Sequence, residues 1–345
     1  MKVLVTGGCG FLGSHICKYY RNKGVEVVSL DNMTKHELMR TGYSVSGARD
    51  FNWKLLKNMG VELVKGDIID LDMVNKLAKD CDFIAHTAAQ PAMTISEEDP
   101  RLDINSNVMG TFNVLEAARK FDIPIVSCAT GHVYGPERIN NSIVEKETRY
   151  VRDPMGIDEN EPILQGIKTP LHASKRSAEI YVQTYIDTYK LKAASFRLSG
   201  IYGSNQFGGE DHGWVANFAI RTLINKPLRV LGNGKQTRDI LYATDVARVF
   251  DAFFENQVSG VYNIGGGEKT VISLLECIDM IEKITGVEPK VEYGPDRFGD
   301  LRYFVCDISK AREKLGWEPK ILPKEGIIKL CEWIKENINV FKDKE

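Results

Sequence analysis

The stretch that decides the fold opens the chain and reads Lys2-Val3-Leu4-Val5-Thr6-Gly7-Gly8-Cys9-Gly10-Phe11-Leu12-Gly13-Ser14-His15. An apolar strand runs into spaced glycines and then into a helix, the arrangement that binds the phosphates of a dinucleotide. Gly7 permits the tight turn, Gly10 lets the backbone approach a pyrophosphate, and Gly13 allows close packing of helix on strand. Free N–H groups at the helix start face the phosphates. The opening therefore predicts a dinucleotide site with contacts from Gly7, Gly10, Phe11 and Leu12.

A carboxylate at the end of the second strand indicates which dinucleotide binds. The apolar run 25–30 ends in Asp31, about 20 residues after the glycines, where a carboxylate can bond both ribose hydroxyls. Asp31 would repel a 2′-phosphate, and the next residues, Asn32-Met33-Thr34, include no arginine. The sequence therefore predicts NAD rather than NADP as the cofactor.

The bulk composition is that of a globular protein and excludes several classes. At 345 residues and 43% hydrophobic, the chain can bury one large or two smaller cores. A net charge of -2 offers no basic face for nucleic acid, and no apolar run is long enough for a signal peptide or a membrane span. Seven scattered cysteines without a CxxC pair indicate neither a disulfide framework nor a zinc site. We expect no metal and a reducing, cytoplasmic setting.

Strand and helix patterns alternate through the first half of the chain. Such alternation predicts an α/β fold of the Rossmann type, a doubly wound parallel sheet with helices on both faces. A segment rich in Gly, Ser and Thr, 33–49, is expected to be a mobile loop beside the adenosine half of the cofactor. The expected strands are 3–5, 26–30, 62–65, 83–86 and 124–128, and the expected helices are 11–23, 73–78 and 108–121.

The second half predicts a smaller lobe. After a helix at 170–189 and a strand at 193–197, the elements become shorter. We expect residues 1–200 to form the NAD-binding domain and residues 201–345 to form mainly a mixed α/β substrate lobe, with some segments returning to the first domain. The lobe would close over the carboxyl edge of the sheet, where ligands of open α/β sheets bind. Its expected elements are helices at 214–224, 244–255 and 273–285 and strands at 228–231 and 261–264.

Motifs over nearly the whole chain resemble, in order, those of the extended short-chain dehydrogenase/reductase family, which includes nucleotide-sugar epimerases and dehydratases. Besides the glycine turn they are Asp31-Asn32, Gly66-Asp67-Ile68, His86-Thr87-Ala88-Ala89-Gln90, Asn107-Val108-Met109-Gly110-Thr111, Thr130-Gly131-His132-Val133-Tyr134-Gly135, Ala173-Ser174-Lys175, residues 197–203, Gly232-Asn233-Gly234-Lys235-Gln236-Thr237-Arg238-Asp239, Arg297-Phe298-Gly299-Asp300 and Leu315-Gly316-Trp317-Glu318-Pro319.

Within that family the chain looks most like the CDP-tyvelose (CDP-paratose) 2-epimerases. This resemblance implies transient oxidation of a CDP-linked hexose at C2, with hydride passing to NAD and returning to the other face of the ketone. It also implies a CDP- or UDP-linked sugar as substrate and a homodimer or homotetramer. The stretches that carry it are Gln90-Pro91-Ala92-Met93-Thr94, Glu147-Thr148-Arg149-Tyr150, Gln206-Phe207 and Asp211-His212-Gly213-Trp214-Val215.

The usual catalytic base of the family is missing. Such enzymes place a tyrosine one helical turn before a lysine; here Lys175 is present, but the residue four earlier is Leu171, followed by His172. His172 could act as the base, Lys175 or Thr130 could act through a water, or the chain could bind its ligands without efficient turnover. Related dehydratases carry an Asp-Glu pair directly after the threonine, whereas this chain has Gly131-His132, which disfavours dehydration.

The resemblance assigns further site residues. Thr130, at a strand end, would bond the sugar oxygen, and Arg238, Arg297 and Gln206 would hold the substrate, since a guanidinium fork suits a diphosphate. The NAD contacts beyond the glycine turn and Asp31 would be Asn32, Asp67, Ile68, Ala88, Ala89, Gln90, Asn107 and Lys175. Two other functions stay open: an NAD and nucleotide-sugar binding protein with little turnover, and an epimerase of another nucleotide sugar, for example at C4 of a UDP-hexose.

Overall fold

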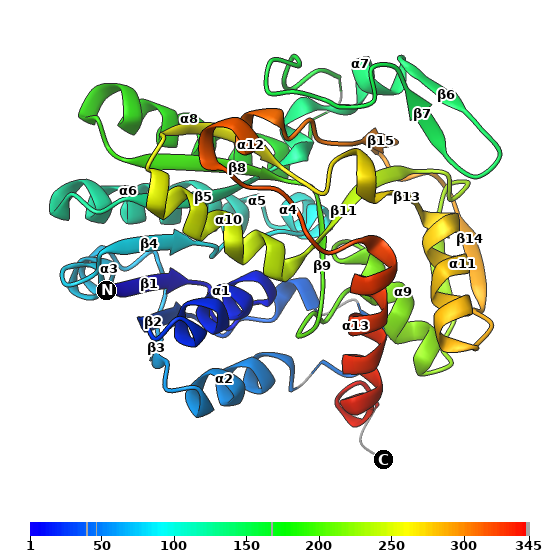
Figure 1. Cartoon of the computed structure of the whole chain (residues 1–345), viewed down its shortest axis with the longest axis horizontal. Helices are drawn as coiled ribbons and strands as arrows, with labels where there is room; N and C mark the ends of the chain where they lie inside the picture. Colours follow the sequence, from blue (N-terminus) through cyan, green and yellow to red (C-terminus); the bar gives the residue numbers. More distant parts are fainter. Residues whose placement is uncertain (39–40, 46, 167, 343–345) are drawn as a thin grey trace.

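A seven-stranded parallel sheet forms the centre of the molecule (Figure 1). The structure is a computed structural model that describes residues 1–38, 41–45, 47–166 and 168–342. The strand order β12-β8-β5-β4-β1-β2-β3 is that of a doubly wound sheet, so the predicted fold class is confirmed. The strands are β1 (Lys2–Thr6), β2 (Glu26–Asp31), β3 (Glu62–Lys65), β4 (Phe83–His86), β5 (Ile125–Thr130), β8 (Ala193–Leu198) and β12 (Gly260–Ile264).

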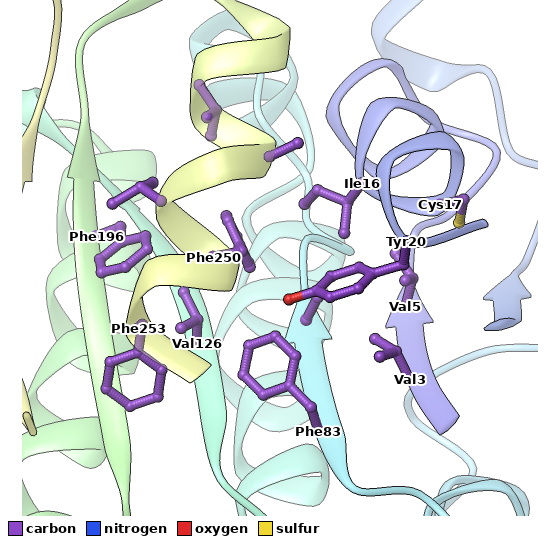
Figure 2. Packing of buried hydrophobic residues seen from close by; sticks show 14 of the residues in the cluster. Val3, Val5, Ile16, Cys17, Tyr20, Phe83, Val126, Phe196, Phe250 and Phe253 are labelled. Carbon is purple, nitrogen blue, oxygen red and sulfur yellow. The ribbon is translucent and has the colours of Figure 1, made fainter. Parts of the chain in front are cut away.

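Helices cover both faces of this sheet because its strands are apolar on both sides. Along β1, Val3 and Val5 pack toward one face and Leu4 toward the other. Figure 2 shows the first face, where Tyr20 of α1 (Phe11–Asn22) and Phe250 of α10 (Ala243–Asn256) lie over the sheet. The opposite face packs against α3 (Leu71–Ala78), α6 (Gly110–Phe121) and α8 (Pro170–Tyr189).

A second, mixed lobe follows β8. A four-stranded sheet there joins β9 (Gly200–Tyr202), β11 (Thr237–Tyr242), β13 (Val271–Ser273) and β15 (Tyr303–Phe304), while β10 (Leu228–Leu231) pairs with β14 (Val291–Gly294). Helices α9 (Trp214–Leu223), α11 (Leu274–Thr285) and α13 (Pro323–Glu336) bury the core of this lobe, on the right of Figure 1. Strand β12 and helices α10 and α12 (Ser309–Leu315) pack on the central sheet and its helices, although they lie late in the chain.

The segment 33–49 departs from the expected mobile loop. It contains a 3-10 turn, η1 (His36–Leu38), and leads into α2 (Ala48–Asn58), a helix that the sequence patterns did not predict. Tyr43 is buried, packs edge-on against Phe341, and donates a hydrogen bond to the carbonyl of Gly208. These contacts tie the segment to the second lobe, so its described residues form a link between the two parts of the molecule.

The remaining elements are short and lie around the ends of the strands. They are α4 (Met93–Glu98), α5 (Pro100–Ile104), the π-helical η2 (Asn105–Met109), η3 (Gly131–Tyr134), α7 (Pro136–Asn140), β6 (Ile143–Glu145), β7 (Tyr150–Arg152), η4 (Glu268–Thr270) and η5 (Ile338–Val340). Among the described residues, no helix has both the length and the apolar composition that a bilayer crossing needs.

Candidate active site and cofactor crevice

The turn between β1 and α1 lies directly against the loop after β4. Gly7 has a φ of 69°, and a Cβ atom there would lie 2.8 Å from the backbone of Ala88. At Gly13 a Cβ atom would lie 2.1 Å from the carbonyl oxygen of Gly7. Both positions therefore require glycine. Within the described chain no side chain caps the start of α1, which leaves N–H groups of its first turn available for an anion.

Asp31 holds the glycine turn in place. One carboxylate oxygen accepts the N–H of Cys9 at 2.9 Å, and the other accepts the N–H of Met33 at 2.8 Å. The side chain is buried at the end of β2 and lines the adjoining cavity. Each carboxylate oxygen has more than one lone pair, so these bonds leave acceptors for two ribose hydroxyls.

A cavity of about 350 Å³ runs along the carboxyl ends of β1, β2 and β4. It gathers most of the residues predicted to contact NAD, namely Gly7, Gly10, Asp31, Asn32, Asp67, Ile68, Ala88, Ala89 and Gln90. Phe11 and Leu12 line an adjoining cavity of about 200 Å³, which also contains Gly7 and Gly10. We call these two cavities together the cofactor crevice.

Arg49 is a crevice residue that sequence reasoning missed. It lies in the first turn of α2, lines both cavities of the crevice, and donates from Nε to the carbonyl of Thr34 at 3.0 Å. Burial lowers the pKa of Arg49, and the charge of Asp31 opposes that shift. The prediction of NAD over NADP rested on the residues directly after Asp31, which include no arginine. The structure brings the guanidinium of Arg49 into the same cavity from a later helix.

The crevice contains buried polar atoms that have no hydrogen-bond partner, and these show whether it suits a dinucleotide. Among the described residues, Asn205 Nδ2, Gln206 Oε1 and His212 Nδ1 are buried without a hydrogen-bond partner, and all three residues line the cavity beside Phe11. A buried polar group left unpaired costs about 1–3 kcal/mol. A ligand with acceptor oxygens, such as a pyrophosphate, would satisfy the Asn205 amide and a protonated nitrogen of His212. The crevice therefore fits NAD.

Gln206, a predicted substrate contact, lines the cavity of the crevice that Gly7 and Gly10 also line. It does not line the cavity that holds Arg238 and Arg297, and its contact with substrate stays a prediction. Its Nε2 donates to the carbonyl of Ile201 at 3.3 Å, which fixes the loop after β9. The motif Gln206-Phe207 turns back over α1 because Phe207 packs into the second lobe's core.

The predicted catalytic pair occupies the carboxyl end of β5 and the start of α8. Thr130 is half-buried, and its Oγ1 accepts the N–H of His132 at 3.3 Å. Lys175 is only 9% exposed. Burial lowers the pKa of its ammonium, while nearby Cys128 and Asp103 oppose the shift. Burial thus disfavours the charged form of Lys175, and Cys128 and Asp103 partly restore it.

Gln90 and Asn107 build the floor of this region. Asn107 Oδ1 accepts the N–H of Gln90 at 2.9 Å, and Asn107 Nδ2 lies 3.0 Å from Asp103 Oδ1 and 3.1 Å from Ser174 Oγ. Gln90 Nε2 donates to the same Asp103 oxygen. Asn107 is 1% exposed and does not line the two cavities of the crevice, so it acts here as a brace between the loop after β4 and α8.

Leu171 and His172 begin α8 and are both buried. The N–H of Leu171 donates to Ser96 Oγ at 3.1 Å. The N–H of Thr169 donates to His172 Nδ1 at 2.9 Å, completing a capping box at the start of the helix. This bond uses the only lone pair of a neutral imidazole, which is the lone pair that a proton acceptor needs. His172 is therefore positioned as a helix cap.

The two predicted phosphate arginines do meet in one cavity, between α9 and β11. Arg238 lies 3.8 Å from Asp300, and Arg297 lies 3.3 Å from Asp211 and donates to the carbonyl of Glu210 at 2.7 Å. Burial lowers the pKa of Arg238, and the charge of Arg297 adds to the shift. This cavity, the arginine cavity, is also lined by Trp214, Asn217, Phe218, Arg229, Gln236 and Leu274.

A sequence model of the NAD dependent epimerase/dehydratase family matches residues 3–265. The chain belongs to this family, and the predictions of a nucleotide-sugar epimerase-type enzyme and of NAD as its cofactor are confirmed at that level. It is similar to the CDP-paratose 2-epimerase of Salmonella typhi, at 35% identity over 96% of this chain and 99% of that protein. It is similar to the same degree, 35% over 97% and 99%, to a putative UDP-glucose 4-epimerase of Methanocaldococcus jannaschii.

Solved structures show the same architecture. The UDP-glucose 4-epimerase of Thermotoga maritima with UDP-glucose has a TM-score of 0.81 at 28% identity, covering 98% of this chain and 100% of that one. The UDP-glucose 4-epimerase of Thermus thermophilus in complex with NAD has a TM-score of 0.78 at 31% identity, covering 97% and 99%.

Proposed function

We propose that the protein epimerises C2 of a CDP-linked hexose through transient oxidation to a keto sugar. The observation that carries this proposal is that one loop, 210–214, lines both the arginine cavity and the cofactor crevice. Glu210 and Trp214 line the arginine cavity, where Arg297 also pairs with Asp211, and His212 lines the crevice. A nucleotide sugar with its diphosphate on the arginines would thus extend its hexose toward Thr130 and the nicotinamide end of the crevice.

The chain's own residues would then act as follows. Arg238 and Arg297 would exchange their carboxylate partners for the diphosphate, a stronger anion for a guanidinium fork. Thr130 would hold the reacting sugar oxygen, and the buried Lys175 would stabilise negative charge on it. NAD, held by the glycine turn and Asp31, supplies a reversible hydride acceptor at the sugar carbon.

Contacts between the subgroup motifs support the C2 assignment. Thr94 Oγ1 donates to Asp211, which joins the stretch 90–94 to the stretch 211–215 at the edge of the arginine cavity. Gly131-His132 supplies no carboxylate of the kind that dehydration uses.

The equal identity to a putative UDP-glucose 4-epimerase keeps a UDP-hexose and C4 as the second candidate. Leu171 in place of the usual tyrosine favours the third candidate, a binding protein with little turnover.

Product analysis separates these candidates. The NAD-loaded protein, incubated with CDP-paratose or with UDP-glucose, is analysed by proton NMR of the sugar products. The proposal expects the C2 epimer from CDP-paratose and no conversion of UDP-glucose. Conversion of UDP-glucose alone would establish the C4 alternative. Binding of both nucleotides by calorimetry without any conversion would establish the binding protein.

We also propose a homodimer or homotetramer in a cytoplasmic setting. Helix α8 packs beside α6 and exposes apolar side chains, including Ile180 (47% exposed) and Tyr181 (40%). All seven cysteines are free, and six of them are buried, which suits a reducing compartment.

A further inference from the structure

One histidine lies between the catalytic strand end and the arginine cavity. His132 follows Thr130 by two residues in η3, and its ring centroid is 5.6 Å from that of His172 on α8. Electrostatic interactions also couple it to Arg238 and Arg297. In the proposed function, the hexose occupies this interval between the diphosphate and Thr130.

The ring of His132 is available for chemistry, whereas that of its neighbour is not. His132 is half-buried, and the hydrogen bond that it makes to Thr130 comes from its backbone N–H rather than from its ring. His172 spends its lone pair on the N–H of Thr169. Leu171 cannot exchange a proton. Of Leu171, His172 and His132, the last is therefore the one whose lone pair is not already used in the helix cap.

We propose that His132 is the catalytic base that takes the proton of the reacting sugar hydroxyl, in place of the missing tyrosine. This inference rests on the proposed function. The O–H bond of the sugar breaks, and its proton forms an N–H bond on the imidazole. The electron pair left on oxygen becomes the second bond of the ketone, as the hydride on the same carbon departs to NAD. On the return step the hydride and the proton come back to carbon and oxygen.

The charges around His132 link its proton affinity to substrate binding. Burial, followed by the charges of His172, Arg238 and Arg297, lowers its pKa to about 3, so the free enzyme holds it neutral at pH 7. A diphosphate on the arginines offsets their charge and raises that pKa once the sugar is in place. Charged groups of β8 and α8 also lie behind η3: Arg197 donates to the hydroxyl of Tyr134, and Glu179 pairs with both Arg197 and Arg176.

A neutral base loses activity as the pH falls through its pKa. The acid limb of kcat, which reports the substrate complex, should therefore lie at higher pH than that of kcat/KM, which reports the free enzyme. Coincident acid limbs would contradict the link between the arginines and His132.

The first experiment measures proton transfer directly. NAD-loaded His132→Gln is mixed with CDP-paratose, and reduced nicotinamide is followed in a single turnover. We expect a rate roughly 10²-fold or more below wild type, with CDP affinity by calorimetry within about threefold. Imidazole should restore His132→Ala and leave the wild type unchanged. Adding Leu171→Tyr to His132→Gln should also restore the rate, because a phenol there lies one helical turn before Lys175.

The second experiment does not depend on turnover. In NAD-loaded protein with labelled histidine, the Cε1–H signal of His132, assigned by its loss in His132→Gln, is titrated with and without CDP. The proposal expects a higher midpoint with CDP. A midpoint that CDP leaves unmoved despite binding would overturn it, as would a His132→Gln rate within about threefold of wild type. If reduction depends on His132 but no C2 epimer forms, the base assignment stands and the proposed C2 function fails.

Discussion

At the scale of single residues, Asp31 and Arg49 place opposite charges in one cavity of the crevice, and we expect this balance to set the choice of cofactor. Asp31→Ala should weaken NAD binding by more than tenfold, about 1.4 kcal/mol, because the ribose hydroxyls lose their acceptor. It should also raise NADP affinity relative to NAD, since the carboxylate that repels a 2′-phosphate is removed while the charge of Arg49 stays in the same cavity. Titrations of both cofactors test this, with the exposed Asp72→Ala as control. Equal affinity of the wild type for NADP would contradict the assignment.

The arginine cavity makes a separate prediction for substrate. Arg238→Ala and Arg297→Ala should each lose about 1.5–3 kcal/mol of CDP-sugar affinity, because each removes a charge-assisted contact to the diphosphate. NAD binding should persist in both. Calorimetry with CDP, UDP and GDP sugars measures the effect, and Arg312→Ala, an exposed arginine outside this cavity, is the matched control. Unchanged affinity for all three nucleotides would place the substrate elsewhere.

At the scale of elements, His172 belongs to the start of α8. His172→Ala should lower the free energy of unfolding by about 1 kcal/mol, while His172→Gln should retain stability, since glutamine also completes a capping box. Denaturant unfolding of the NAD-loaded protein measures this. A stable His172→Gln that no longer reduces nicotinamide would instead make His172 the proton acceptor.

The helices and strands also show which parts of the fold could be predicted from the sequence. The local sequence patterns predicted β3, β4 and α8 with their observed bounds, and in β4 every residue of the apolar run is buried. Helix α2 was missed because a polar segment precedes it and its buried face includes Asn52, which binds the carbonyl of Cys9. Strand β11 was missed because the motif residues 232–239 resemble a loop until β9, β13 and β15 pair with it.

The site residues also divide into those that local sequence pattern locates and those that only tertiary packing brings into place. Residues of the glycine turn and strand ends meet in the crevice because parallel strands bring their carboxyl ends to one edge. The crevice position of Arg49 depends on how α2 packs back, and that of Gln206 on how Phe207 enters the second core. The surroundings of His132 depend on how η3 packs against α8 and near Arg238 and Arg297. No local pattern encodes such long-range contacts.

At the scale of the whole molecule, the exposed apolar side chains of α8 predict self-association. Ile180→Glu with Tyr181→Glu should convert the assembly to monomers, because charges would be buried against a second copy. Sedimentation equilibrium tests this, with Val144→Glu, exposed on β6, as control. A wild type that is already monomeric would contradict the predicted homodimer or homotetramer.

The central claim is that a sugar carbon, C2, is oxidised transiently on this chain without the usual tyrosine. The most direct measurement is stopped-flow formation of reduced nicotinamide after NAD-loaded protein is mixed with CDP-paratose deuterated at C2. We expect slower reduction than with unlabelled sugar, and deuterium retained at C2 of the epimerised product. Reduction slowed only by deuterium at C4, or no reduction while CDP-paratose binds, would contradict it.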